Sequence, residues 1–350
     1  MFDNRNGYVS EKNNDYDPTV EKEVSTTVNK GYINQLFENT GMDISEVSQT
    51  ELEGIDLFRL FGNYHFVINH CGDMSDNTDA VLKQAIELTH FDQKLKDVVL
   101  PEVLRVEEWF RARLRDAYVQ EYGNALLQRE QFPSLQKGEL AGIAKNCAEE
   151  MRKQHSPIDA ILLEDEGEEQ AVKRFEVLVQ HASFGTKRRL YTGADDGMRH
   201  CVSLELGITP EILDSWLAVF VELRNTIAHS GTLWNKSFEG TTLVIPNTNE
   251  CRERHILSQV DKGSLFACLT VLTYVIKRLD PDTSLQQDLR ALFMDRSNSE
   301  LEMMGFKMEQ ESFQIWTADT PSLAGEINAQ RTSRTVEYSF VSFSECIESN

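Results

Sequence analysis

The chain has 350 residues and a formal net charge of −22, with 35 Lys and Arg residues against 57 Asp and Glu residues. This length suffices for one large domain or two smaller ones, and no apolar run approaches the roughly 20 residues that cross a bilayer. The negative charge argues against a protein that coats nucleic acid, because such proteins neutralise phosphates with a basic surface. Any contact with RNA would therefore be local.

The six cysteines are scattered along the chain without a Cys-x-x-Cys pair. This pattern is typical of reduced thiols rather than of a disulfide framework or a zinc site. The N-terminal residues lack the basic and apolar blocks of a signal peptide, so we expect a cytoplasmic protein with no membrane segment. No Gly-rich phosphate loop and no set of carboxylates spaced for magnesium is present in the sequence, and we expect neither a metal nor a cofactor.

Residues 1–27 are polar and show no apolar period, which predicts a mobile N-terminal arm. Apolar residues then recur at helical spacing, and we expect an all-α, multi-helix domain over residues 28–317. Its first long helix is predicted over about residues 49–69. Residues 318–350 form a predicted C-terminal tail beyond this domain.

Two helices separated by Pro101 are predicted next, the first of them capped by Thr78. Glu107 and Arg111 lie four residues apart on the second helix, in the orientation that favours an intrahelical ion pair. An alternative role for Arg105 and Arg111 is to line an approach for RNA. The sequence leaves both roles open.

Lys187, Arg188 and Arg189 form a basic triplet in a segment that we predict to be a loop. Their charges make them candidate contacts for phosphate groups. Lysines and arginines in loops are, however, usually just solvated. The acidic run at residues 164–169 is likewise expected to be a solvated surface.

The clearest helix of the chain begins at Thr209, a suitable N-cap residue, with Pro210 at the first helical position. Apolar residues then recur at spacings of three and four, which predicts a buried face. Gly231 marks the expected end of the helix.

Arg224, Asn225 and His229 gather at the C-terminal end of this helix. Asn225 and His229 share a face, and Arg224 is long enough to turn toward them. The helix dipole favours a protonated imidazole and a nearby guanidinium opposes it, so a histidine here can transfer protons near neutral pH. From spacing alone, capping of the last carbonyls by Arg224 and His229 is the plainer interpretation.

After the motif helix, the β-branched run at residues 241–245 predicts a short strand, bounded by a glycine and a proline. Residues 336–343 approach the alternation of a second strand, which would pair with this one or with the sheet edge of a partner. Between them, residues 262–279 predict a helix that is apolar almost all round and therefore central. Residues 285–294 predict one more short helix.

The sequence Arg-Asn-x-x-x-His at the end of the motif helix resembles the active-site motif of HEPN domains. The continuation Ala-His-Ser-Gly-Thr-Leu-Trp-Asn is similar to one branch of them, the Abi family of bacterial abortive-infection proteins (AbiD/AbiF-like). Leu233, Trp234 and Asn235 carry this likeness. A second histidine often follows the first in that family, and Ser230 takes its place here.

Other segments resemble the same family in patches from about residue 30 to 317. Residues 91–95 are similar to its Phe-Asp-x-x-Leu signature, and residues 105–111 to its Arg-x-Glu-x-x-x-Arg signature. Residues 183–186 resemble its Phe-Gly-Thr turn, and residues 303–306 resemble its closing Met-Gly-Phe.

The resemblance implies a HEPN-like helical bundle that cleaves RNA without a metal ion. The ribose 2′-hydroxyl attacks the adjacent phosphorus, His229 moves a proton, and Arg224 stabilises the charge on the phosphoryl oxygens. HEPN domains commonly pair, which implies a homodimer whose two motifs face each other. The predicted catalytic residues are Arg224, Asn225 and His229; the candidate RNA contacts are Arg105, Arg111, Lys187, Arg188 and Arg189; and the supporting residues are Glu107, Glu222, Trp234 and Asn235.

Three functions remain open from the sequence. The first is an endoribonuclease toxin in phage defence, with an antitoxin or a phage trigger as a further partner. The second is a non-catalytic module that holds a small regulatory RNA. The third is a scaffold in which Arg224 and His229 serve only the dimer interface.

Overall fold

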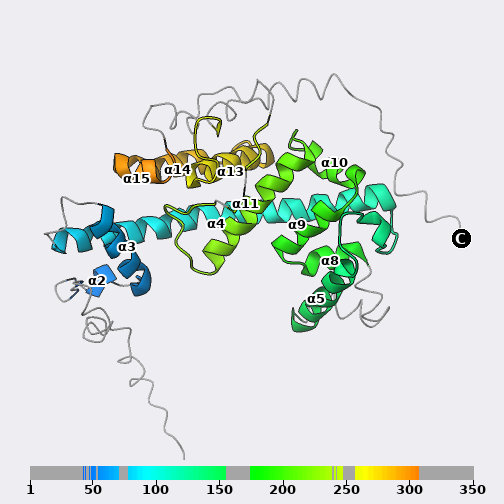
Figure 1. Ribbon diagram of the computed structural model, residues 1–350, viewed down its shortest axis with the longest axis horizontal. Helices are drawn as coiled ribbons and strands as arrows, with labels where there is room; N and C mark the ends of the chain where they lie inside the picture. Colours follow the sequence, from blue (N-terminus) through cyan, green and yellow to red (C-terminus); the bar gives the residue numbers. More distant parts are fainter. Residues whose placement is uncertain are drawn as a thin grey trace, which may run out of the picture. The chain divides into compact units, whose positions relative to one another are not determined.

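The computed structural model describes residues 42, 44, 47, 49–52, 54–70, 78–154, 174–238, 240, 241, 243–246 and 257–306 (Figure 1). Within these ranges the fold is all-α, as predicted, and contains no strand. The predicted N-terminal arm, the C-terminal tail, the second strand and the acidic run lie outside the described residues. None of the described helices combines the length and the apolar character of a membrane span.

The chain divides into two compact units, residues 1–90 and residues 91–350. The helices α2 (Gln49–Leu52) and α3 (Leu57–His70) belong to the first unit. They replace the single helix predicted over 49–69, because Gly54 takes a left-handed φ of 76° and Asp56 starts α3 anew. Oδ1 of Asp56 accepts a hydrogen bond of 3.0 Å from the N–H of Phe58.

Helix α4 (Thr78–Tyr122) continues through Pro101, so the predicted break at this proline is wrong. Its buried residues recur at spacings of three and four on both sides of the proline, and this packing holds the helix together. Because proline has no N–H, Pro101 leaves the carbonyl of Asp97, four residues earlier, without its helical donor. Both residues are exposed. Water can therefore satisfy that carbonyl. The fully buried positions are Ala85, Leu95, Val99, Val103, Val106, Phe110 and Leu114.

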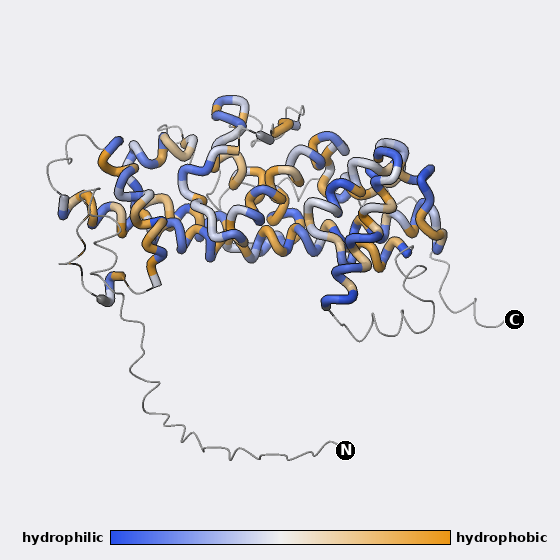
Figure 2. Tube along the Cα trace, turned by 60° about the horizontal axis from the view of Figure 1, so that its bottom comes forward, coloured by the Kyte–Doolittle hydropathy of each residue, from blue (hydrophilic) through white to orange (hydrophobic). Residues whose placement is uncertain are grey.

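The second unit holds the remaining helices, in which apolar and polar positions alternate around the axis as in amphipathic helices that share a core (Figure 2). Helix α11 packs against α9, α10 and α13, while α5 packs against α8 and α13 against α14. Their bounds are η3 (Arg129–Gln131), α5 (Glu139–Gln154), α8 (Phe175–His181), α9 (Phe184–Gly193), α10 (Asp196–Leu204), α11 (Pro210–Ala228), α13 (Leu265–Leu279), α14 (Leu285–Met294) and α15 (Asn298–Met303).

Helix α13 is central to the core, as its apolar sequence predicts: every residue from Leu265 to Thr273 is buried. It begins after the N-cap Ser264, three residues later than predicted. Gly305 lies against this cap with a φ of 91°, and a Cβ atom there would stand 2.3 Å from the Cβ of Ser264. The middle residue of the Met-Gly-Phe segment therefore has to be glycine.

The strand predicted over residues 241–245 is not formed by the residues described there, namely 241 and 243–245. Backbone groups of this segment pair with side chains of α11 instead of with another strand. The N–H of Val244 donates to Oγ of Ser215 at 3.0 Å, and its carbonyl accepts from Nε1 of Trp216 at 3.0 Å. Because both groups are satisfied, no partner strand is needed.

Residues 183–186 begin a helix and do not form the predicted turn. Ser183 is the N-cap of α9, and its Oγ accepts a hydrogen bond from the N–H of Thr186 at 3.2 Å. The basic triplet that follows consequently lies on α9 and not in a loop.

Candidate functional site

Helix α11 is anchored in the core along most of its length. Thr209 and Pro210 occupy the predicted N-cap and first helical positions. The buried side chain of Trp216 packs edge-on against Tyr274 of α13, with ring centroids 5.2 Å apart. Leu223 is also buried, so the helix remains held down to its last turns.

The C-terminal end of α11 closes with a Schellman motif. The N–H of Ser230 donates to the carbonyl of Ile227 at 3.0 Å, and the N–H of Gly231 donates to that of Thr226 at 2.7 Å. Ser230 is the left-handed residue of this motif, with a φ of 58°. Gly231 follows it, just past the end of the helix as predicted. A Cβ atom at Gly231 would make a tight contact of 3.0 Å with the carbonyl oxygen of Thr226, which favours glycine at this position.

Neighbouring substitutions at this helix end should have opposite effects on stability. Ser230→Gly relieves the left-handed conformation of a residue with a side chain and should raise the free energy of unfolding by about 1 kcal/mol. Gly231→Ala crowds the carbonyl of Thr226 and should lower it. Urea unfolding of both variants measures the two signs, and equal signs would contradict this assignment of the motif.

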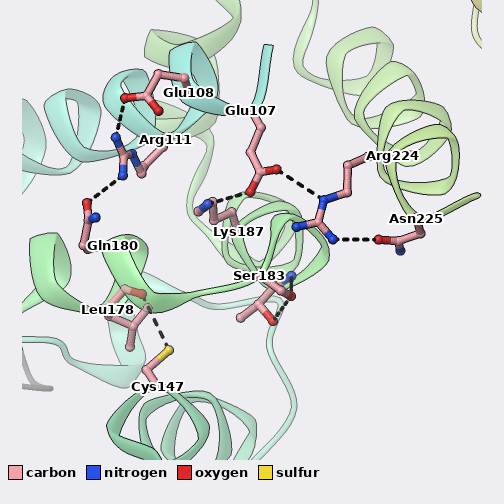
Figure 3. Close-up of polar contacts among 11 residues, drawn as sticks. Glu107, Glu108, Arg111, Cys147, Leu178, Gln180, Ser183, Lys187, Arg224 and Asn225 are labelled. Carbon is pink, nitrogen blue, oxygen red and sulfur yellow. Dashed lines mark hydrogen bonds and ion pairs between the residues drawn. The ribbon is translucent and has the colours of Figure 1, made fainter. Parts of the chain in front are cut away.

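Arg224 lies near the end of α11, and its guanidinium turns toward α4 (Figure 3). Its Nε lies 3.7 Å from Oε2 of Glu107, and its Nη1 donates a hydrogen bond of 3.3 Å to Oδ1 of Asn225. The side chain remains 33% exposed. The described residues give it no other polar partner, so its remaining N–H groups are available to an anion such as phosphate.

Glu107 stands between two cations (Figure 3). Its Oε1 accepts a hydrogen bond of 2.9 Å from Nζ of Lys187, while Oε2 faces Arg224. The predicted ion pair of Glu107 with Arg111 is wrong: Arg111 pairs with Glu108 and donates to Oε1 of Gln180 at 2.7 Å. Glu107 therefore serves contacts between helices and not contacts within α4.

His229 is the C-cap residue of α11 and is exposed. Its backbone N–H donates to the carbonyl of Asn225 at 2.9 Å, while its imidazole has no polar partner among the described residues. The structure brings Arg224 together with Asn225 and Glu107, but not with His229. Backbone N–H groups bond the last carbonyls of α11, so neither Arg224 nor His229 acts as the side-chain cap that spacing alone suggested.

The five candidate RNA contacts all have protein partners. Lys187 is only 5% exposed, which keeps its ammonium group below the surface. Arg188 forms a bidentate pair with Asp214 of α11, with distances of 2.9 and 3.2 Å. Each of the others also pairs with a carboxylate: Arg105 with Asp280, Arg111 with Glu108, and Arg189 with Glu139.

The pair of Arg189 with Glu139 joins α9 to the start of α5. Hydrogen bonds from Arg189 and from the N–H of Gln136 hold the pKa of Glu139 far below its ordinary value, at about 2. Glu139 is therefore ionised at neutral pH, and an RNA phosphate would have to compete with it for Arg189.

The segment after the Schellman motif is fixed by a buried carboxylate that the sequence analysis included in a family signature but did not predict as a site residue. Oδ1 of Asp92 on α4 accepts hydrogen bonds from the N–H groups of Leu233 at 2.6 Å and Trp234 at 2.8 Å. Asp92 also pairs with Lys96, one turn further along α4, and both side chains are buried. Two charged residues on the apolar face of a helix were the signal in the sequence.

Three of the predicted supporting residues lie on or near the segment that Asp92 holds, which we call the Asp92 clamp. Trp234 is buried, and Asn235 takes a left-handed φ of 54°. Glu222 forms an ion pair with Lys236, with 3.0 Å between Oε1 and Nζ, and this pair connects the segment to α11. These residues shape the chain that leaves the motif, while none of them contacts His229 through a polar group in the described structure.

Among the described residues, no three His, Cys, Asp or Glu side chains gather in the manner of metal ligands. Burial raises the pKa of the Cys147 thiol to about 11 and raises that of Cys268 as well. These two thiols are therefore protonated at neutral pH and poor nucleophiles. The end of α11 itself carries the imidazole of His229 and the guanidinium of Arg224.

A family model described as Abi-like protein matches residues 50–235, more than half of the chain. The match takes in the whole of α11 and the segment held by Asp92. Comparisons with curated proteins and with solved structures find no match. The chain belongs to the family of Abi-like proteins, a membership that fits a role in abortive infection.

Proposed function

We propose that this chain is a HEPN-type endoribonuclease of the AbiD/AbiF-like branch, which cleaves RNA in the cytoplasm without a metal ion and acts as a toxin in phage defence. The observation that carries the proposal is the end of α11. An exposed imidazole that has no polar partner among the described residues lies there, together with a partly exposed guanidinium whose remaining N–H groups these residues leave unused, five residues apart on an anchored helix. These are the two groups that transesterification of RNA requires.

The reaction needs no other nucleophile, because RNA supplies its own. The ribose 2′-hydroxyl attacks the adjacent phosphorus, and the bond from phosphorus to the 5′-oxygen breaks. His229 takes up or delivers a proton, and Arg224 stabilises the negative charge on the phosphoryl oxygens. The products are a 2′,3′-cyclic phosphate, or the 3′-phosphate after hydrolysis, and a 5′-hydroxyl.

Two copies of the chain would complete the site. Acid and base are both useful in this reaction, while one motif offers a single imidazole. The exposure of His229, together with its lack of contact with Arg224 in the same chain, supports a homodimer in which two motifs face each other. Such a pair would supply two imidazoles and two guanidiniums to one cleft.

Cleavage of total cellular RNA in EDTA tests the proposal. We expect fragments with cyclic phosphate and 5′-hydroxyl ends from the wild-type protein, and no cleavage of DNA, which lacks the 2′-hydroxyl. The His229→Ala protein, purified in the same way, controls for a contaminating ribonuclease.

Two other results would contradict a metal-independent nuclease. Cleavage that requires added magnesium would point to a metal-dependent reaction or to a contaminant. Intact RNA with both proteins, and the same RNA co-purifying with each, would favour the module that holds a small regulatory RNA.

A further inference from the structure

Lys187, Glu107 and Arg224 form a cluster that joins α9, α4 and α11 (Figure 3). Nζ of Lys187 lies 2.9 Å from Oε1 of Glu107, and Oε2 of Glu107 lies 3.7 Å from Nε of Arg224. One carboxylate thus contacts two cations, each through a separate oxygen. Two positive charges and one negative charge leave the cluster with a net charge of +1, which one phosphodiester would neutralise.

Lys187 cannot meet an RNA backbone directly, because it is only 5% exposed. A buried ammonium group requires a counter-charge, and Glu107 provides it at hydrogen-bonding distance. Within the described structure, Glu107 connects Lys187 to the candidate site, because it pairs with Lys187 and with Arg224.

The guanidinium of Arg224 is held at two points. Glu107 faces its Nε, and the side chain of Asn225 accepts from its Nη1. Because the guanidinium is planar and rigid, two contacts on separate nitrogens set the direction of its remaining donors. Those donors belong to a side chain that is 33% exposed.

We propose that Lys187 and Glu107 are positioning residues for Arg224: Lys187 holds Glu107, and Glu107 sets the orientation in which Arg224 meets the scissile phosphate. This inference rests on the proposed nuclease function and changes the role of Lys187 from an RNA contact to an indirect one. A displacement of about 1 Å in a group that stabilises the transition state can lower the rate roughly 100-fold. The effect of Lys187 should therefore depend on Arg224.

The first test uses NMR and requires no activity. The Nε–Hε signal of Arg224 in the full-length protein is assigned by its loss in Arg224→Lys. Lys187→Met and the nearly isosteric Glu107→Gln should shift this signal and speed its exchange with water. The control is Arg199→Met, which removes another cation between helices, 3.5 Å from Glu211 at the opposite end of α11. It should leave the Arg224 signal in place, and an unchanged signal in Lys187→Met would overturn the proposal.

The second test is a double-mutant cycle on RNA cleavage. Lys187→Met and Glu107→Gln should each lower kcat roughly 10–100-fold, with a smaller change in KM, while Arg199→Met should not. In the Arg224→Ala background, Lys187→Met should cause no further loss. Equal losses in both backgrounds would mean that Lys187 acts by another route, which overturns the proposal.

The two tests separate this inference from the function on which it rests. If the wild-type protein does not cleave RNA, the nuclease proposal fails, and the NMR signal of Arg224 still decides whether Lys187 and Glu107 position it. Thermal unfolding of each variant identifies any that fail to fold. In that case the double variant Lys187→Met with Glu107→Gln, which removes both charges of the pair, takes the place of the single one.

Discussion

Replacing Asp92 with alanine is expected to lower the free energy of unfolding by roughly 3–5 kcal/mol. The buried carboxylate pairs with Lys96 and accepts the N–H groups of Leu233 at 2.6 Å and Trp234 at 2.8 Å. Its removal takes the counter-charge from a buried ammonium group and the acceptor from two buried N–H groups. Urea unfolding followed by circular dichroism measures the loss as a lower midpoint.

Asp97 provides the matched control on the same helix. It is exposed and accepts a hydrogen bond of 2.9 Å from Gln93, so Asp97→Ala should change stability by no more than about 0.5 kcal/mol. Adding Lys96→Met to Asp92→Ala should recover part of the loss, because it removes the uncompensated charge. Similar small losses at Asp92 and Asp97 would show that the clamp contributes little to stability.

The His229→Ala protein should cleave RNA roughly 10²–10⁴-fold more slowly than the wild type, the range for loss of a general acid or base. Its stability should stay within about 0.5 kcal/mol of the wild type, because the imidazole is exposed and has no polar partner among the described residues. Single-turnover cleavage and urea unfolding of the same preparations measure the two quantities.

His200 of α10 is a second exposed histidine and gives the matched control. His200→Ala should cleave RNA at the wild-type rate. A loss of rate in both variants would indicate a general effect of removing an exposed imidazole, and no loss in His229→Ala would exclude it from proton transfer.

Helix α11 shows how far local chemistry could be predicted from the sequence. The N-cap Thr209, Pro210 at the first position and the buried face all follow from short-range preferences, and the structure contains them. Gly231 lies just past the end of the helix, as expected. The left-handed conformation belongs to Ser230, although glycine is the usual choice there, and this assignment depends on backbone geometry that the sequence does not show.

Two errors share a cause, which is that tertiary contacts override local preferences. Packing on both sides of Pro101 keeps α4 continuous. Side chains of α11 satisfy the backbone of Val244, so the β-branched run does not need a partner strand. In both cases the deciding partner lies elsewhere in the fold. A third error is local, because Ser183 caps a helix where a turn was expected and accepts a hydrogen bond from the N–H of Thr186.

The candidate site likewise contains features that the sequence predicts and features that depend on tertiary packing. The positions of Arg224, Asn225 and His229 at one helix end follow from their spacing along α11. The partners of Lys187 and Glu107 do not, because these residues lie 80 positions apart and meet only when α9 packs near α4. A basic triplet in a sequence therefore shows where charge is present, but not which of its members reaches the surface.

The continuity of α4 restricts how this chain can change in length. Asp92, which holds the segment after the motif, and Glu107, which faces Arg224, lie on one uninterrupted helix. Deleting a single residue between them would turn one relative to the other by about 100° and shorten their separation by about 1.5 Å. Substitutions at the exposed positions from 93 to 106 are compatible with both contacts, whereas insertions and deletions there are not.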